Sequence, residues 1–307
     1  MKIMRKVDLH LTQESGQTSQ APWRLINNKY SNMILIDEIP VLLKLSQNSL
    51  DSIDVEYELL DENVNEKRIY DEIAKIYDLD FNLNKFYKFL SNDEKLKPSI
   101  DFCSSLRLFL AKDPFQSIIS SISSANNSII RWTKSMHKVS STWGKKYEFP
   151  SGTFYSFPSP KTLSNVYEDE EVNNHKYVNN LKACGLGYRA NYIKKASKIF
   201  ASEINPSDIK DMKYDEAFET LIKINGIGPK VADCILLYGY GFTEAFPSDV
   251  WIKRIISYLY FDRKDIKVDK VRTFGMERFK DYAGYTQLYL FHYARKSGLM
   301  SKLKPKN

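Results

Sequence analysis

The sequence feature that most constrains the fold is a short glycine turn between two apolar segments, Asn225-Gly226-Ile227-Gly228. Glycine at both positions allows a positive φ and leaves the backbone amides uncovered. Pro229 follows, and its missing N–H costs nothing in the first turn of a helix, so we expect a helix to begin there. The turn therefore predicts two connected helices, and amides at the start of the second could hold a phosphate oxygen. A plain helix–turn–helix corner is the alternative.

Lys230 lies at the N-terminus of this predicted helix, where the helix dipole disfavours a positive charge. That field, together with a partly desolvated pocket, would lower the pKa of Lys230 and favour the neutral amine, the form that can attack carbon. A lysine that extends into solvent is the alternative. Asp249 opens another predicted helix, where it or Ser248 could be the N-cap. Asp249 could also lie near Lys230, orienting the amine or stabilising positive charge.

The bulk composition of the 307 residues narrows the class of protein. Lysine and arginine number 45 against 38 acidic residues, and the net charge of +7 favours an anionic partner. The three cysteines are too few for a disulfide framework, an iron–sulfur cluster or an all-cysteine zinc site. No apolar run could span a bilayer, and the N-terminus lacks the apolar core of a signal peptide. We therefore expect an intracellular protein with no membrane partner.

Two regions of different character follow one another along the chain. The first hundred residues hold short β-rich segments and turns, which predict an antiparallel sheet, and a helix over Ile69–Ile76. From about residue 98 the pattern becomes helical, and Asp113-Pro114 marks one helix start. Strands are expected around 24–26, 33–36 and 53–57. Further helices are expected at 129–139, 173–183, 190–203, 215–223, 229–238, 249–260 and 285–295, with an ordered loop over 142–161.

These residues carry a resemblance to a known family. GIGPKVADCILL followed by FPSDV is similar to the helix-hairpin-helix of the DNA glycosylase superfamily, and most similar to its eukaryotic-type 8-oxoguanine DNA glycosylase/AP lyases. Four other stretches resemble that family: DPFQSIISSISSANNSIIRWT, ACGLGYRANYI, AGYTQLYLFHYAR and LTQESGQTSQAPWRL. The resemblance implies an α+β fold. A TATA-binding-protein-like N-terminal antiparallel β-sheet domain would span residues 1–98, and a mainly α-helical helix-hairpin-helix glycosylase domain residues 99–307.

Carried over position by position, the resemblance implies a catalytic pair and a phosphate grip. Lys230 is the implied nucleophile and Asp249 the implied catalytic carboxylate. Gly226, Gly228 and Val231 match the positions whose backbone amides hold DNA phosphate. The family has a bound cation at this turn, so a structural cation near Gly226 and Gly228 is expected. No other cofactor and no catalytic metal is expected.

The implied base pocket draws on three segments of the chain. Cys234 follows Lys230 by four residues and Phe291 follows Gln287 by four, so each pair shares a helix face. In the family the cysteine and the phenylalanine sandwich the flipped base, and the glutamine reads its Watson–Crick edge. Gly16 matches the glycine whose carbonyl accepts the N7–H that only the oxidised guanine has. Core packing is the alternative for Cys234 and Phe291.

Four residues match those that occupy the hole left by the flipped base. Tyr188 is the implied wedge, while Asn126, Arg131 and Arg189 would hydrogen-bond the orphaned cytosine. Surface phosphate contacts or solvated charge are the alternatives for the two arginines. The match at Arg131 predicts a preference for cytosine opposite the lesion. Trp251 departs from the family, which usually has a histidine near the phosphate there, although the indole N–H could donate instead.

The resemblance thus implies a monomeric, bifunctional DNA repair glycosylase. It would excise 8-oxoguanine from double-stranded DNA through a lysine Schiff base and nick the abasic site by β-elimination. Three alternatives stay open: a glycosylase for another damaged purine, a non-catalytic helix-hairpin-helix DNA-binding protein, and a helical protein-interaction domain. The Lys230–Asp249 pair argues against the second, and the glycine turn with the positive charge against the third. The short tail Lys302–Lys306 is a weak signal for nuclear targeting.

Overall fold

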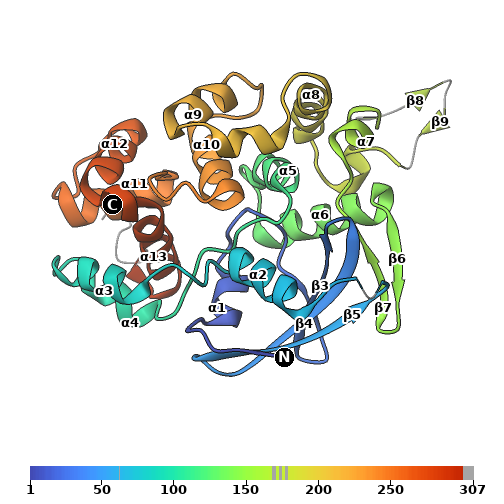
Figure 1. Cartoon of the computed structure of the whole chain (residues 1–307). Coiled ribbons are helices and arrows are strands. Elements are labelled where there is room, and N and C mark those ends of the chain that lie inside the picture. Colours follow the sequence, from blue (N-terminus) through green and yellow to red (C-terminus); the bar gives the residue numbers. More distant parts are fainter. Residues whose placement is uncertain (62, 168–170, 173–174, 177–178, 300–307) are drawn as a thin grey trace.

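The computed structural model describes residues 1–61, 63–167, 171–172, 175–176 and 179–299. An antiparallel sheet formed by the N-terminal residues lies against a larger body of helices (Figure 1). The strands are β1 (Lys2–Ile3), β2 (Arg24–Ile26), β3 (Lys29–Ile36), β4 (Ile39–Ser49), β5 (Ser52–Leu59), β6 (Lys146–Phe149), β7 (Gly152–Tyr155), β8 (Glu171–Val172) and β9 (His175–Lys176). The predicted order, a sheet followed by helices, is confirmed.

The α-helices carry most of the remaining residues. They are α1 (Leu9–Glu14), α2 (Glu66–Ile76), α3 (Leu83–Ser91), α4 (Lys97–Phe102), α5 (Pro114–Ser124), α6 (Ile129–Trp143), α7 (Pro160–Ser164), α8 (Arg189–Ser202), α9 (Tyr214–Ile222), α10 (Pro229–Ile235), α11 (Val250–Tyr260), α12 (Val268–Phe279) and α13 (Ala283–Lys296). Three 3-10 turns and one π-helical turn complete the described helical elements: Lys182–Cys184, Pro206–Asp211, Lys280–Tyr282 and, as the π-helical turn, Leu236–Tyr240.

Local turn chemistry sets the register of the N-terminal sheet. Its strand order is β1-β5-β4-β3-β2, and all neighbours are antiparallel. Two-residue turns join β2 to β3 and β3 to β4. Asn27 and Asn28 both have a positive φ, as do Asp37 and Glu38. Paired positive φ values match the right-handed twist of a β-hairpin, so each turn fixes which side chains of its strands face inward.

Both faces of this sheet are covered. On β4, Val41 packs with α2 in one apolar core, while the adjacent Leu42 packs with Phe149 and Phe154 of the β6–β7 hairpin. Successive side chains of a strand point to opposite faces, so the two cores lie on opposite sides of the sheet. The hairpin occupies the expected ordered loop over 142–161, which therefore serves as a cover for the sheet.

The start of the helical region follows its expected capping chemistry. Asp113 caps α5 by accepting from the amide of Phe115 at 2.9 Å, and Pro114 occupies the first turn. Ile118 and Ile122 of this helix are buried. The sequence prediction of this helix is confirmed.

The helix expected at 173–183 is wrong in its described part. That stretch holds the short strand β9 and the start of a 3-10 turn, which ends at Gly185 with a φ of +85°. Leu181 and Cys184 are buried. The apolar residues that suggested a helix therefore belong to a single turn that enters the core.

Helices α3 and α13, which are far apart in the sequence, pack against each other. Phe86 of α3 meets Tyr289 of α13 edge to face, with ring centroids 5.0 Å apart. Both side chains belong to the same apolar core as α5 and α10. The division between domains, expected between residues 98 and 99, stays a prediction. None of the described helices is long and apolar enough to cross a membrane.

Candidate active site

The predicted hairpin is the turn between α9 and α10. Gly226 has a φ of +96°, and a Cβ there would lie 2.5 Å from the Cβ of Tyr192, so only glycine fits. Gly228 is the N-cap of α10 with an ordinary φ of −88°, and no heavy atom lies within 4 Å of the place of its Cβ. Glycine at both positions would allow a positive φ, but only Gly226 adopts one. Gly228 contributes an open backbone at a helix start that no side chain caps.

Lys230 is the second residue of α10, and its side chain hydrogen-bonds Cys234 one turn further on. Burial lowers the pKa of Lys230, but Cys234 and the carboxylate of Asp249 outweigh burial, so the pKa lies above the usual value of a lysine. The predicted neutral amine is therefore wrong for this state of the protein, because two neighbouring groups stabilise the ammonium. Lys230 is half-buried rather than extended into solvent.

Asp249 is the N-cap of α11, as its position in the sequence suggested. Its Oδ1 accepts hydrogen bonds from the amides of Trp251 at 2.8 Å and Ile252 at 2.9 Å. Among the described residues no hydrogen bond engages Oδ2. The charge of the same carboxylate raises the pKa of Lys230. Asp249 therefore caps α11 with Oδ1 and keeps Oδ2 available to act on Lys230.

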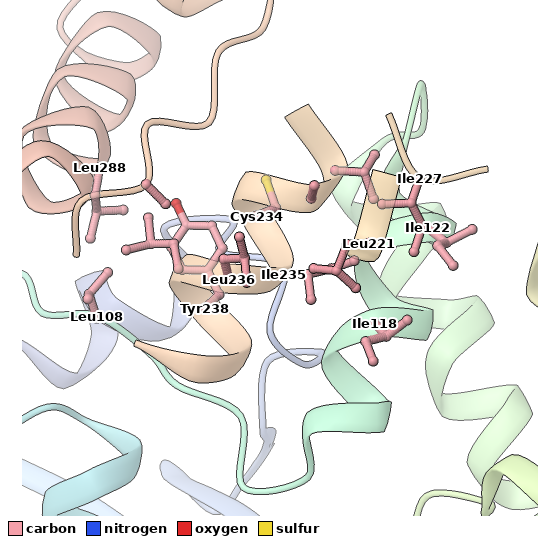
Figure 2. Packing of buried hydrophobic residues seen from close by; sticks show 14 of the residues in the cluster. Leu108, Ile118, Ile122, Leu221, Ile227, Cys234, Ile235, Leu236, Tyr238 and Leu288 are labelled. Atoms are coloured by element: carbon pink, nitrogen blue, oxygen red, sulfur yellow. The ribbon is translucent and has the colours of Figure 1, made fainter. Parts of the chain in front are cut away.

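Helix α13 holds Gln287 against the segment that follows α10. Nε2 of Gln287 donates to the carbonyl of Pro247 at 3.0 Å, and its Oε1 accepts from the hydroxyl of Tyr238 at 3.3 Å. Tyr238 follows Cys234 by four residues, and Figure 2 shows both side chains on one helical segment. Sequence reasoning missed Tyr238, although this spacing places it on the helix face of Lys230 and Cys234.

Phe291 and Gly16, which are far apart in the sequence, both lie beside Arg295. Phe291 is half-buried, and its ring centroid lies 5.0 Å from Cζ of Arg295. Gly16 has a φ of +85°, and a Cβ there would lie 3.0 Å from Nη1 of Arg295 and 2.9 Å from Cδ1 of Ile129. The structure thus places the predicted N-terminal pocket residue beside α6 and α13.

Hydrogen bonds fix the segment that carries Gly16. Oε1 of Gln17 accepts from the amide of Phe109 at 2.8 Å. The side chain of the buried Thr18 hydrogen-bonds the thiol of Cys234. Burial raises the pKa of that thiol, although Lys230 and Thr18 oppose the change. Thr18 was missed by sequence reasoning, because nothing in the sequence connects it with a residue more than two hundred positions away.

Three of the four residues expected in the vacated DNA stack lie together: Asn126, Tyr188 and Arg189. Arg189 is buried, and its Nε and Nη2 donate to the carbonyls of Ala125 at 2.7 Å and Asn126 at 2.8 Å. Its Cζ lies 4.4 Å from the ring centroid of Tyr188, which is 56% exposed. Arg189 is therefore neither a solvated charge nor a surface contact. The fourth residue, Arg131, is exposed in the first turn of α6.

Trp251, where the sequence departs from the expected histidine, follows the cap residue of α11. Its ring is 42% exposed and lies 5.3 Å from Cζ of Arg254. Within the described ranges, no group of three or more His, Cys, Asp or Glu side chains could hold a metal ion.

Comparison with known proteins places this geometry in a family. Residues 119–281 match the HhH-GPD superfamily of base excision DNA repair proteins, and residues 2–118 match the N-terminal domain of 8-oxoguanine DNA glycosylase. The chain belongs to this superfamily. The predicted family, the predicted fold class and the prediction of a DNA repair enzyme are confirmed.

Individual relatives agree with this assignment over most of the chain. A probable N-glycosylase/DNA lyase of Methanothermobacter thermautotrophicus is 41% identical over 306 residues, which cover 97% of this chain and 96% of that protein. One similar solved structure is the 8-oxoguanine glycosylase/lyase of Clostridium acetobutylicum, in complex with double-stranded DNA containing cytosine opposite 8-oxoguanine. It has a TM-score of 0.79 and is 31% identical, and the match covers 96% of this chain and 93% of that chain. A 3-methyladenine DNA glycosylase from Archaeoglobus fulgidus also has a TM-score of 0.79, at 24% identity with 97% and 99% coverage, and shows the shared fold.

Proposed function

We propose that the protein excises 8-oxoguanine from double-stranded DNA, preferably opposite cytosine, and then nicks the abasic strand by β-elimination. One observation carries the proposal: two helices and a cap converge on one place. Helix α10 brings Lys230 and Cys234, α13 brings Gln287 and Phe291, and Asp249 joins them from the start of α11. The protein would act as a monomer, inside the cell, where the DNA is.

Lys230 performs the covalent step. After losing its proton, its amine bonds to C1′ of the sugar while the C1′–N9 bond breaks and its electron pair leaves on the base. Asp249 stabilises the positive charge that develops on the sugar. The nitrogen then loses a second proton, and the sugar ring opens as the C1′–O4′ bond breaks and O4′ takes up a proton, which gives the protonated Schiff base. Its positive charge acidifies C2′–H, and loss of that proton expels the 3′ phosphate, which cuts the strand.

The pocket residues select the base. Cys234 and Phe291 sandwich it, and the carbonyl of Gly16 accepts N7–H, which guanine lacks. Nε2 of Gln287 is bound to the carbonyl of Pro247, and its Oε1 accepts from Tyr238, so Oε1 keeps one lone pair with which it would accept from the base. An acceptor suits the N1–H and N2–H donors of a guanine edge, and this supports a guanine-derived lesion.

Backbone groups and wedge residues hold the DNA. The amides of Gly226, Gly228 and Val231 bind a phosphate, and carbonyl oxygens of the turn near the two glycines bind a structural cation, which adds positive charge beside that phosphate. The open backbone at Gly228 fits this role. DNA affinity at constant ionic strength should then fall when sodium and potassium are replaced by tetramethylammonium, which is too large for the turn.

Tyr188 enters the stack, and Asn126, Arg131 and Arg189 contact the orphaned cytosine. Arg131 is exposed and can reach the cytosine. Arg189 uses Nε and Nη2 in its two hydrogen bonds to carbonyls, so Nη1 is left to donate to the cytosine. Equal excision opposite all four bases would rule out this reading of the opposite strand.

The decisive experiment incubates the enzyme with an 8-oxoguanine:cytosine duplex, with and without borohydride. We expect base release, strand cleavage and a trapped covalent adduct. Lys230→Gln should abolish the adduct, while Lys223→Gln, a matched change at an exposed lysine just before the turn, should not. An adduct that survives Lys230→Gln would exclude this nucleophile. Salt-sensitive binding without base release would indicate a non-catalytic DNA-binding protein, and release of another damaged purine alone would indicate a different glycosylase.

A further inference from the structure

Helix α13 presents a third residue on the face that lines the base pocket. Gln287, Phe291 and Arg295 are spaced four residues apart, so they form one stripe along the helix. The first two belong to the proposed pocket. No role described so far involves Arg295.

The guanidinium of Arg295 lies at the edge of this pocket. Its Cζ is 5.0 Å from the centroid of the Phe291 ring, and its Nη1 is 3.0 Å from the place where a Cβ on Gly16 would be. A side chain at position 16 would therefore displace it. The absence of that side chain lets one guanidinium contact two of the proposed base-binding residues.

The part of the chain that the structure describes offers Arg295 no hydrogen-bond acceptor. Among the described residues, no hydrogen bond or ion pair engages its guanidinium, although much of the residue is exposed. Burial lowers its pKa, and the nearby carboxylate of Asp249 only partly opposes this. By contrast, Arg107 and Arg189, both buried, donate to backbone carbonyls. The guanidinium therefore lies at the edge of the pocket with its donors available to an acceptor on a ligand.

The helix end does not account for this placement. Basic residues in the last turn of a helix favour its dipole, and Lys296 supplies such a charge. Among the described residues, no hydrogen bond, ion pair or ring contact engages the Lys296 side chain. Arg295, its neighbour, is instead turned onto Phe291 and toward Gly16.

We propose that Arg295 is a specificity-determining residue that donates a hydrogen bond to the 8-oxygen of the flipped base. This inference rests on the proposed function and on the position of Gly16 within it. N7–H and C8=O are adjacent on the oxidised base, so they present a donor beside an acceptor. The Gly16 carbonyl and the Arg295 guanidinium offer the complementary acceptor and donor. Guanine presents an N7 acceptor and a C8–H at these positions, so it can pair with neither the Gly16 carbonyl nor the Arg295 guanidinium.

The test measures affinity for two uncleavable duplexes, both with cytosine in the opposite strand. One carries 2′-fluoro-8-oxodeoxyguanosine and the other a tetrahydrofuran abasic analogue, which has the backbone but no base. Arg295→Met keeps an unbranched side chain against Phe291 and removes the donors. We expect it to weaken binding of the first duplex by about tenfold to a hundredfold and to leave the second within about twofold. Arg295→Lys should fall between, and Lys296→Met should resemble the wild type on both duplexes.

The other outcomes overturn the inference in distinguishable ways. Equal losses on both duplexes would assign Arg295 to the DNA backbone, and no loss on either would leave it a solvated helix-end charge. Strand cleavage at a preformed abasic site, which needs Lys230 but no base, must stay at the wild-type rate in Arg295→Met; a drop there would mean that the change damages the fold. If the wild type itself does not prefer the 8-oxoguanine analogue, the proposed function fails instead.

Discussion

At the scale of single residues, the site depends on which neighbours surround one amine. The spacing of Lys230 and Cys234 on one helix face, and the position of Asp249 at a helix start, could both be predicted from sequence. The direction of the lysine pKa could not, because it depends on which side chains approach from other segments. Helix dipole and burial favour the neutral form, and the hydrogen bond to Cys234 together with the charge of Asp249 reverses that preference.

Cys234→Ala should make Lys230 easier to deprotonate. Burial lowers the pKa of Lys230, and Cys234 is the first of the groups that oppose burial, so its removal lowers the pKa. At a given pH more of the amine is then neutral, and the rise of activity with pH moves to lower pH. The measurement is the rate of borohydride trapping on preformed abasic DNA across a pH series, which avoids any effect on base binding.

Cys184→Ala is the matched control for that experiment. Cys184 is also buried, but Thr142 and Lys138 are the groups that lower its pKa, and neither belongs to the site. Its removal should leave the pH profile in place. If the pH profile of Cys234→Ala does not shift, the sulfur of Cys234 does not raise the pKa of Lys230.

Tyr238→Phe should slow base excision by about twofold to tenfold, the effect of one neutral hydrogen bond. The change removes the donor to Oε1 of Gln287 and keeps the ring. Single-turnover release of 8-oxoguanine measures it, and cleavage of preformed abasic DNA should not change. Tyr240→Phe is the control, since its hydroxyl donates to the carbonyl of Pro206, outside the pocket. Equal rates of excision by both variants would show that the Tyr238 hydroxyl does not contribute to the base pocket.

At the scale of elements, helices with a clear apolar stripe and a cap were predictable and others were not. α5 has both, and the structure contains it as expected. α12 was not predicted, because its buried residues are few: Val271, Gly275 and Phe279. Where tertiary contacts rather than local pattern decide the conformation, as in the turn ending at Gly185, periodicity misleads.

The two glycines of the hairpin should respond differently to alanine. Gly226→Ala requires a positive φ and places a Cβ against Tyr192, so we expect a loss of about 2 kcal/mol or more in the free energy of unfolding. Gly228→Ala meets no heavy atom and an ordinary φ, so its loss should stay within about 1 kcal/mol. Urea unfolding of both variants tests the difference. Equal stabilities would contradict the assigned backbone of the turn.

At the scale of the whole molecule, buried polar contacts join the sheet to the helices. The guanidinium of Arg107 donates to the carbonyls of Lys6 and Asp78, both at 2.6 Å, and of Phe81 at 3.2 Å. A charged side chain that bonds two separate segments, Lys6 and the turn Asp78–Phe81, could not be recognised from sequence, where Arg107 is one arginine among apolar neighbours. The order of the two regions was predictable because the change from period-two to helical patterning is local.

Arg107→Met should therefore cost about 3 kcal/mol in the free energy of unfolding, since it leaves buried carbonyls without donors. Urea unfolding followed by circular dichroism measures the loss. Arg5→Met is the control: Arg5 is exposed, and its change should stay within about 0.5 kcal/mol. Similar midpoints for the two variants would show that Arg107 does not join the segments.

The buried guanidinium of Arg189 has a consequence for the kinetics of lesion capture. It already holds the carbonyls of Ala125 and Asn126, so the loop that we propose meets the vacated stack is shaped before DNA arrives. Little conformational entropy is then lost by the protein on association. The slow part of engagement should be the opening of the duplex itself, and lesions in weakly stacked or mispaired surroundings should be captured faster.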